Sequence, residues 1–285
     1  MRRRSRGNNP LKLAALSSAL AVAMGGMGYM AWQSMGKVTA DQLGCFANAP
    51  QPQTVVLLDV SEPRFNDEQA RSLKRYLDQL YNSLDFNERL SVVTTAEDQI
   101  GSVPKARSHV CGQATSAAEL EAVNAEGASA GFLAKQKQRL YEKVFAPAIA
   151  SVLSPDAASR QRYQSPILEL VKGIRHFQPL RPGDRLIVVS DLIQNSDSVQ
   201  FCRTQNDMPP FSVFAKRPVN GRLKPDSMEG IDVELLMIQR QGYGQGEFSY
   251  CYSEEELSRF WRDYFSANGV DNPSLIRIRH GYVEG

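Results

Sequence analysis

The chain has 285 residues, of which 42% are hydrophobic and 22% are charged, with 33 basic against 31 acidic side chains. This is ordinary globular usage, and the chain is long enough to form one well-packed core. The sequence contains no basic stripe interleaved with aromatic residues, which excludes the electrostatic signature of a nucleic-acid-binding protein.

The first predicted element is a segment able to cross a membrane. Residues 1–12 contain five basic and no acidic side chains, and residues 13–32 contain no charged side chain. About 20 apolar residues at about 1.5 Å each span the ~30 Å hydrocarbon core of a bilayer. Because a basic flank stays in the cytoplasm, we expect 1–12 to be a cytoplasmic tail and 13–32 to be a transmembrane anchor. This places the protein in a bacterial inner membrane, with its C-terminal domain in the periplasm.

A cleavable signal peptide is the alternative to this anchor. Ala21-Val22-Ala23 offers a small-x-small cleavage site. The apolar run continues past this site to Tyr29 and Trp32, an interfacial pair that favours the anchor. Cleavage after Ala23 would instead leave a soluble domain.

Residues 33–52 are predicted to be a polar, extended linker, and residues 53–285 alternate strand patterns with helix patterns. Strands are predicted at 54–60, 89–95, 185–192, 231–238 and 274–280, with a shorter one at Ser108–Cys111. Helices are predicted from a capping box of Asn66 and Gln69 to Leu84, from Lys135 to Leu153 with an interruption near Pro147, from Ser165 to Phe177, and from a capping box of Ser253 and Glu256 to a stop at Gly269. This alternation favours an α/β three-layer sandwich with a mostly parallel central sheet.

The four cysteines are widely spaced, and no pair has the C-x-x-C spacing of a metal or redox site. In an oxidising compartment such an even set favours two disulfides. Cys45 precedes the first strand and Cys111 ends a candidate hairpin, whereas Cys202 and Cys251 flank the second half of the sheet. We therefore predict the pairs Cys45–Cys111 and Cys202–Cys251, with buried free thiols as the alternative.

Polar side chains gather where predicted strands end, which is where open α/β sheets form binding sites. Asp59 and Ser61 follow the first strand, Asp191 follows the central strand, and Ser165 begins a helix. Two acids at one sheet edge repel each other unless they are paired. We therefore expect a cation or an arginine beside Asp59 and Asp191.

The same residues also have simpler interpretations. Ser165 could serve only as the N-cap of its helix. The two aspartates could accept hydrogen bonds from the backbone amides of their own loops. Glu62 and Glu169 could join either arrangement.

This layout resembles the von Willebrand factor A superfamily, a Rossmann-like group of domains, over about residues 53–282. Those domains place a D-x-S-x-S motif after the first strand, a threonine in a middle loop and an aspartate after the central strand. Together these residues hold a divalent cation through which a partner's carboxylate is often bound. The resemblance implies a site for Mg²⁺ or another divalent cation at Asp59, Ser61, Ser165 and Asp191, with Ser165 in place of the threonine.

The match is incomplete, because Pro63 occupies the third motif position and one hydroxyl ligand is missing. Water can fill a vacancy in an octahedral oxygen shell, so both a weakened and an absent metal site stay open. We expect a non-enzymatic, membrane-anchored domain that binds another envelope protein as part of an envelope assembly.

The competing hypothesis is a metal-dependent hydrolase that acts on an envelope substrate, since two carboxylates and a cation can activate water. The sequence contains no G-x-S-x-G elbow and no G-x-x-x-x-G-K loop, and its three histidines are dispersed. The sequence therefore favours binding over catalysis.

Overall fold

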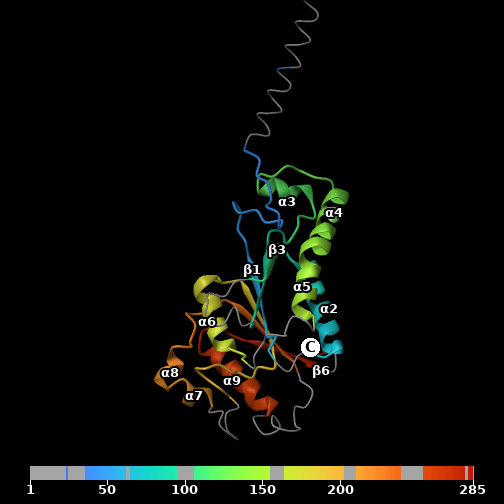
Figure 1. The fold of residues 1–285 in the computed structure, drawn as a ribbon. Helices are drawn as coiled ribbons and strands as arrows, with labels where there is room; N and C mark the ends of the chain where they lie inside the picture. Colours follow the sequence, from blue (N-terminus) through green and yellow to red (C-terminus); the bar gives the residue numbers. More distant parts are fainter. Residues whose placement is uncertain are drawn as a thin grey trace, which may run out of the picture.

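The computed structural model describes Met24 and residues 36–61, 65–95, 106–154, 164–201, 210–238, 253–279 and 282–284. Within these ranges seven strands form one sheet in the order β3-β2-β1-β4-β5-β6-β7 (Figure 1). Their bounds are β1 (Gln53–Leu58), β2 (Arg89–Thr94), β3 (Ser108–Cys111), β4 (Arg185–Ser190), β5 (Asp232–Ile238), β6 (Ser274–Arg279) and β7 (Tyr282–Glu284). The five central strands, β2, β1, β4, β5 and β6, are parallel to one another. The edge strands β3 and β7 each pair antiparallel with their neighbour. The prediction of an α/β fold with a mostly parallel sheet is confirmed, while β7 was not predicted.

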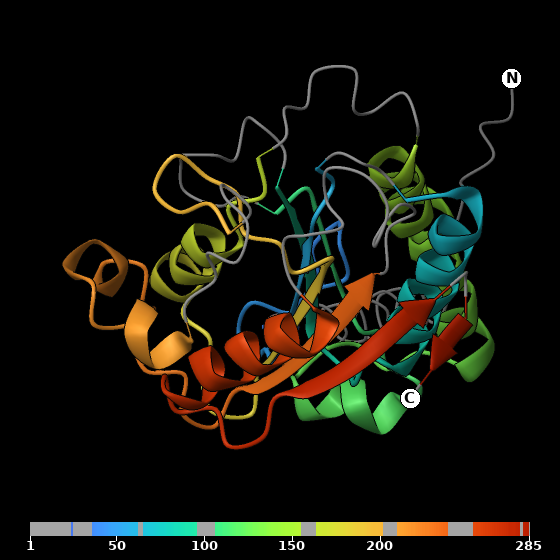
Figure 2. The same cartoon turned by 90° about the horizontal axis from the view of Figure 1, so that it is seen from below.

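Helices cover both faces of this sheet, because the parallel strands are apolar on both sides. Val55 and Leu57 of β1 face one buried cluster, whereas Val56 and Leu58 face the other. On the first face lie α6 (Ile167–Phe177), α7 (Phe211–Phe214), α8 (Pro218–Gly221) and α9 (Glu254–Ser266). On the second face lie α2 (Asp67–Ser83), α4 (Ala130–Leu140), the π-helical turn η2 (Tyr141–Phe145) and α5 (Ala146–Leu153), as Figures 1 and 2 show.

Two of the helices begin with the capping boxes that the sequence predicts. Asn66 Oδ1 accepts a hydrogen bond from the Gln69 N–H (2.8 Å), and Gln69 Oε1 accepts one from the Asn66 N–H (3.1 Å). Ser253 and Glu256 make the equivalent pair at the start of α9. Each box satisfies amide groups that have no partner within the helix, so both helix starts are fixed locally.

The predicted interruption near Pro147 takes the form of a π-helical turn. The Ala146 N–H donates to the carbonyl of Tyr141, five residues earlier, so the chain widens just before the proline. Proline has no N–H and its ring crowds the carbonyl four residues back, here that of Lys143. The helix also begins earlier than predicted, at Ala130, where Ser129 caps it.

The segment 36–50, part of the predicted linker, packs on the body of the domain. The Val38 N–H donates to the carbonyl of Asn124 (3.0 Å), beside the short helix α3 (Ala117–Ala122). Phe46 is buried, and its N–H donates to Asn87 Oδ1 (2.8 Å). This segment therefore forms a small apolar cluster with the region around α3 and the start of α4.

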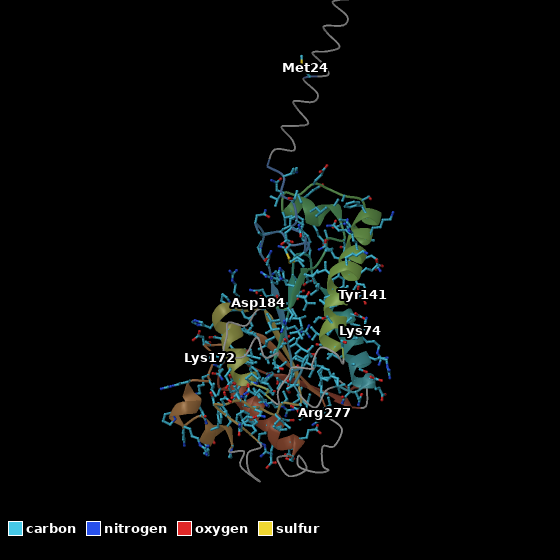
Figure 3. All side chains as sticks on the ribbon, in the orientation of Figure 1. Met24, Lys74, Tyr141, Lys172, Asp184 and Arg277 are labelled. Atoms are coloured by element: carbon cyan, nitrogen blue, oxygen red, sulfur yellow. A yellow bond between two sulfur atoms is a disulfide. The ribbon has the colours of Figure 1, made fainter. Side chains whose placement is uncertain are left out.

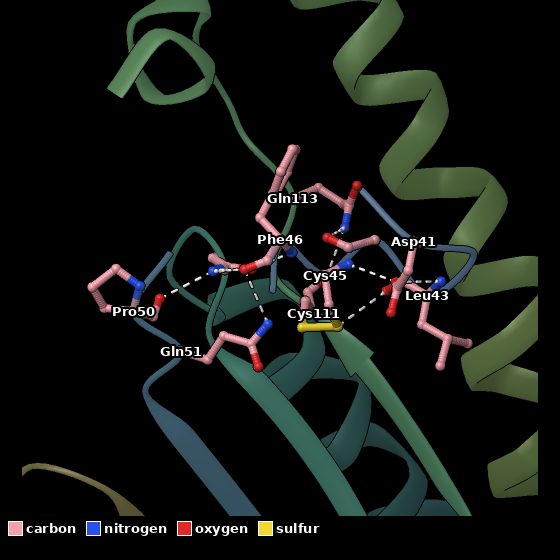
Figure 4. Close-up of a disulfide and its surroundings, with 10 residues drawn as sticks. Asp41, Leu43, Cys45, Phe46, Pro50, Gln51, Cys111 and Gln113 are labelled. Atoms are coloured by element: carbon pink, nitrogen blue, oxygen red, sulfur yellow. Dashed lines mark hydrogen bonds between the residues drawn. A yellow bond between two sulfur atoms is a disulfide. The ribbon is translucent and has the colours of Figure 1, made fainter. Parts of the chain in front are cut away.

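A disulfide joins Cys45 to Cys111 and holds the same segment to β3 (Figure 4). The Cys111 N–H also donates to the carbonyl of Leu43 (3.1 Å). The predicted pair Cys45–Cys111 is confirmed, and the free-thiol alternative is wrong for these two residues. Cys202 and Cys251 lie outside the described residues.

Among the described residues, no helix has both the length and the apolar character needed to cross a bilayer. The predicted tail at 1–12 lies outside the described residues, and so does the predicted anchor at 13–32 apart from Met24.

Candidate functional site at the carboxyl edge of the sheet

The carboxylate of Asp59 is the centre of a buried polar cluster at the carboxyl ends of the parallel strands. Its Oδ1 accepts hydrogen bonds from the Ser61 N–H (3.0 Å) and from Thr95 Oγ1 (3.0 Å). Its Oδ2 accepts from Ser165 Oγ (2.8 Å) and from Ser190 Oγ (2.6 Å). All five residues are buried. Four chain segments that lie far apart in the sequence thus meet on one side chain.

The sheet itself brings these groups together. Asp59, Thr95 and Ser190 stand at the ends of three adjacent parallel strands, β1, β2 and β4. The Asp59 N–H donates to the carbonyl of Val189 (2.8 Å), and the Thr95 N–H donates to that of Leu58 (3.2 Å). Parallel pairing therefore continues up to the site and fixes its backbone.

Asp191 lies next to this cluster, in a loop whose backbone is strained. Its Oδ1 accepts from the Ile193 N–H (2.9 Å) and lies 3.4 Å from Ser190 Oγ. Leu192 has a φ of 64°, a left-handed conformation that costs an L-residue about 1–2 kcal/mol. Trp261 Nε1 donates to the Leu192 carbonyl (2.8 Å), and the Leu192 N–H donates to Ser190 Oγ (2.9 Å). These bonds hold the strained conformation, a feature that clusters at functional sites.

Ser165 does not cap the helix that follows it, so the simple N-cap interpretation is wrong. α6 begins at Ile167, and its N-cap residue is Pro166, which makes no side-chain hydrogen bond to the helix. The Ser165 hydroxyl instead donates to Asp59, while its N–H and carbonyl exchange hydrogen bonds with Asn195 (2.7 and 2.9 Å). The entry to α6 is thereby tied to the loop that follows β4.

Gln194, in the loop after β4, caps α6 from a distance. Its Oε1 accepts the Leu168 N–H (2.9 Å), one of the amides that α6 cannot satisfy internally. Its Nε2 donates to Glu169 Oε2 (2.9 Å), and Ser196 Oγ donates to Glu169 Oε1 (2.5 Å). Glu169, Gln194 and Ser196 thus form a second polar cluster, adjacent to the one around Asp59.

The predicted residues Asp59, Ser61 and Ser165 meet, and Asp191 adjoins them through Ser190. Both aspartates also accept an amide of their own loop, as the simpler interpretation proposed. Sequence reasoning missed Thr95, although its place directly after a strand parallel to β1 was a usable signal. Glu62 and Pro63 lie outside the described residues.

The donor atoms of this site suit a hard cation in type. Two carboxylates and several hydroxyls supply only oxygen, the ligand that Mg²⁺ and Ca²⁺ prefer. Ser165 Oγ donates a hydrogen bond to Asp59. Among the described residues, no donor bonds to the lone pairs of this serine oxygen. The described residues contain no group of three or more His, Cys, Asp or Glu side chains that could hold a metal ion. A cation here would therefore depend on hydroxyl oxygens as well as on Asp191.

No protein-family model matches the sequence, and the search of curated proteins finds no match.

Proposed function

We propose that this protein is a membrane-tethered, periplasmic binding domain of the von Willebrand factor A type, which docks another envelope protein through the carboxyl edge around Asp59. In this proposal a divalent cation such as Mg²⁺ is held by Asp191, Ser61 and Ser165. The cation supplies a positive centre for a carboxylate of the partner, and the protein catalyses no reaction.

The observation that carries the proposal is the state of the Ser165 hydroxyl. The hydroxyl donates its hydrogen bond to Asp59, so the oxygen presents lone pairs in a buried, preorganised position. Ser190 and Thr95, by contrast, each accept a hydrogen bond as well, from the Leu192 and Val60 amides. An electron-poor ligand fits this oxygen, and a cation is the simplest such ligand.

Asp59 has a supporting part in the proposal. It accepts at least four hydrogen bonds, which matches the number of acceptor positions on a carboxylate. We infer that it orients the hydroxyls, while Asp191 contributes the charge. Residues whose rotamers are fixed in this way lose little entropy when a ligand binds.

Thermal unfolding of the full-length protein in detergent tests cation binding. We expect Mg²⁺ or Mn²⁺ to raise Tm relative to EDTA, because a ligand at 100 times its Kd stabilises the folded state by about 2.7 kcal/mol. Asp191→Asn should abolish this shift. Asp197→Asn is the matched control, since Asp197 is an exposed aspartate of the same loop, and its shift should equal that of the wild type.

A wild-type Tm that is equal in EDTA and in either cation would overturn the metal-dependent form of the proposal. Hydrolytic turnover of an envelope substrate that disappears in Asp191→Asn would favour the hydrolase over the binding protein.

A further inference from the structure

A second surface of the domain, on α6 and the segment that contains α7 and α8, gathers basic side chains. Of the nine residues from 216 to 224, four are lysine or arginine and none is acidic. Lys172 of α6 donates a hydrogen bond to the carbonyl of Arg222, and Arg175 Nε donates to that of Ser227 (2.8 Å). Figure 3 labels Lys172 on α6, on the side of the domain where α8 lies. We call this surface the basic patch: Lys172, Arg175, Lys216, Arg217, Arg222 and Lys224.

The charges of the basic patch are not compensated within the described part of the chain. None of the six forms an ion pair with a carboxylate of a described residue, whereas Lys74, Arg185 and Arg277 elsewhere do. The nearby Asp226 lies 3.9 Å from His176 Nδ1 instead. All of the patch side chains are exposed except that of Arg175, which is partly buried. Because basic and acidic residues are nearly equal in number, this segregation does not follow from composition.

These basic residues lie on neighbouring segments, since the hydrogen bond from Lys172 to the carbonyl of Arg222 joins α6 to residues 216–224. Repulsion between exposed charges is screened only beyond about 8–10 Å at physiological salt. An anionic partner would turn the repulsion into attraction, and complementary charge raises the rate of protein association.

The patch also adjoins buried aromatic residues of α7 and α9 and an exposed valine. Phe211 and Phe214 of α7 are buried against Phe260 of α9, with ring centroids 5.7 and 5.1 Å apart. Between them Val213 is 46% exposed, and its carbonyl accepts the Lys216 N–H (3.3 Å). An exposed apolar side chain next to polar and charged residues resembles the polar rim of a protein interface.

We propose that the basic patch, together with Val213, is a docking surface for a protein segment rich in aspartate and glutamate. The described surface presents no exposed aromatic side chain beside the patch on which bases could stack, which favours a protein over a nucleic acid. In Figure 1, α7 and α8 lie far from residues 36–50, where the chain enters from the predicted anchor, so a lipid surface is also disfavoured. The basic patch shares no residue with the cluster around Asp59, and this proposal does not depend on a cation there.

Fluorescence anisotropy with a labelled glutamate-rich peptide tests this proposal on the full-length protein in phosphatidylcholine nanodiscs. We expect binding that weakens as NaCl is raised, and a loss of affinity of at least about tenfold in the double variant Lys216→Glu/Arg217→Glu. The matched control, Lys135→Glu/Arg139→Glu on α4, makes the same change in net charge at exposed positions and should bind like the wild type. Asp191→Asn should also bind normally, which separates this proposal from the preceding one.

Equal loss of binding in the two double variants would show that the peptide responds only to net charge, and would overturn the proposal. Absence of binding to the wild type would do the same. Patch-dependent binding of a single-stranded DNA or of phosphatidylglycerol vesicles, without binding of the peptide, would assign the surface to another class of partner. Unchanged circular dichroism of the variants would show that they remain folded.

Discussion

The buried amide of Gln194 illustrates how single side chains connect the loop after β4 to the helix α6. It accepts the Leu168 N–H and donates to Glu169, so it completes the helix start and fixes an acidic side chain at the same time. Ser165 has the type and position of a helix cap, but its hydroxyl donates to Asp59 and does not cap α6.

We predict that Gln194→Ala destabilises the protein by about 3 kcal/mol, since hydrogen bonds to charged groups contribute about 1.5–3 kcal/mol and a lost N-cap costs about 1 kcal/mol. Urea unfolding of the full-length protein in detergent, followed by circular dichroism, measures this change. Gln200→Ala is the control, because Gln200 is an exposed glutamine of the same loop, and its effect should stay within about 0.5 kcal/mol. Equal stabilities of the two variants would contradict the assigned role.

At this scale, side-chain hydrogen bonds between near neighbours in the sequence were predictable, and those between distant residues were not. The capping boxes of Asn66 and Ser253 depend on a partner three residues away, so their spacing suffices to find them. Ser165 has two competing partners, its own helix and Asp59, which lies 106 positions away in the sequence. The sequence shows both residues, but not which hydrogen bond forms.

Among the helices, α2 and α4 are joined by Tyr81. Its hydroxyl donates to the carbonyl of Lys137 (2.8 Å), and its ring stacks on that of Phe145 at 4.9 Å between centroids. Burial of the phenol disfavours its ionised form and raises the pKa of Tyr81 from 10.0 to about 12. The π-helical turn places Phe145 beside this tyrosine, so the local irregularity contributes to packing.

This pKa shift predicts how stability depends on pH. The folded state binds the phenol proton of Tyr81 more tightly than the unfolded state does. The contribution of Tyr81 to stability is therefore constant below pH 10 and falls as pH rises from 10 to about 12. Tyr81→Phe should cost about 1 kcal/mol at pH 8 through the lost hydrogen bond, and should make the alkaline decline shallower. The decline should persist in part, because burial also raises the pKa of Tyr76 and of Tyr264. Unfolding curves of both proteins at a series of pH values test this, and parallel declines would contradict it.

The elements that the sequence did not reveal share a dependence on tertiary context. β7 has three residues and exists as an antiparallel partner of β6, which is too short a pattern to recognise. Phe46 of the segment 36–50 is buried because its N–H donates to Asn87 and the disulfide holds the neighbouring Cys45 in place. Long apolar strands such as β1 and β4 were predictable because both of their faces are buried.

At the scale of the whole molecule, the candidate site and the segment 36–50 lie at opposite ends of β1. Residues 36–50 pack at the amino end of β1, as Figure 1 shows, while Asp59 follows its carboxyl end. The six residues of β1 separate them by about 20 Å, at about 3.3 Å per residue. In the proposed function, the Asp59 edge is the end of the domain away from residues 36–50, where we expect a partner to reach it.

Site-specific photo-cross-linking in membranes tests most directly whether a partner docks at the Asp59 edge. A photoreactive amino acid replaces Ser198, an exposed residue of the loop after β4, or Glu121 of α3 as a control at the opposite end. We predict a discrete adduct from position 198 that is lost in an Asp191→Asn background and is not formed from position 121. The same adducts from both positions, or an adduct from position 198 that is indifferent to Asp191→Asn, would contradict the account.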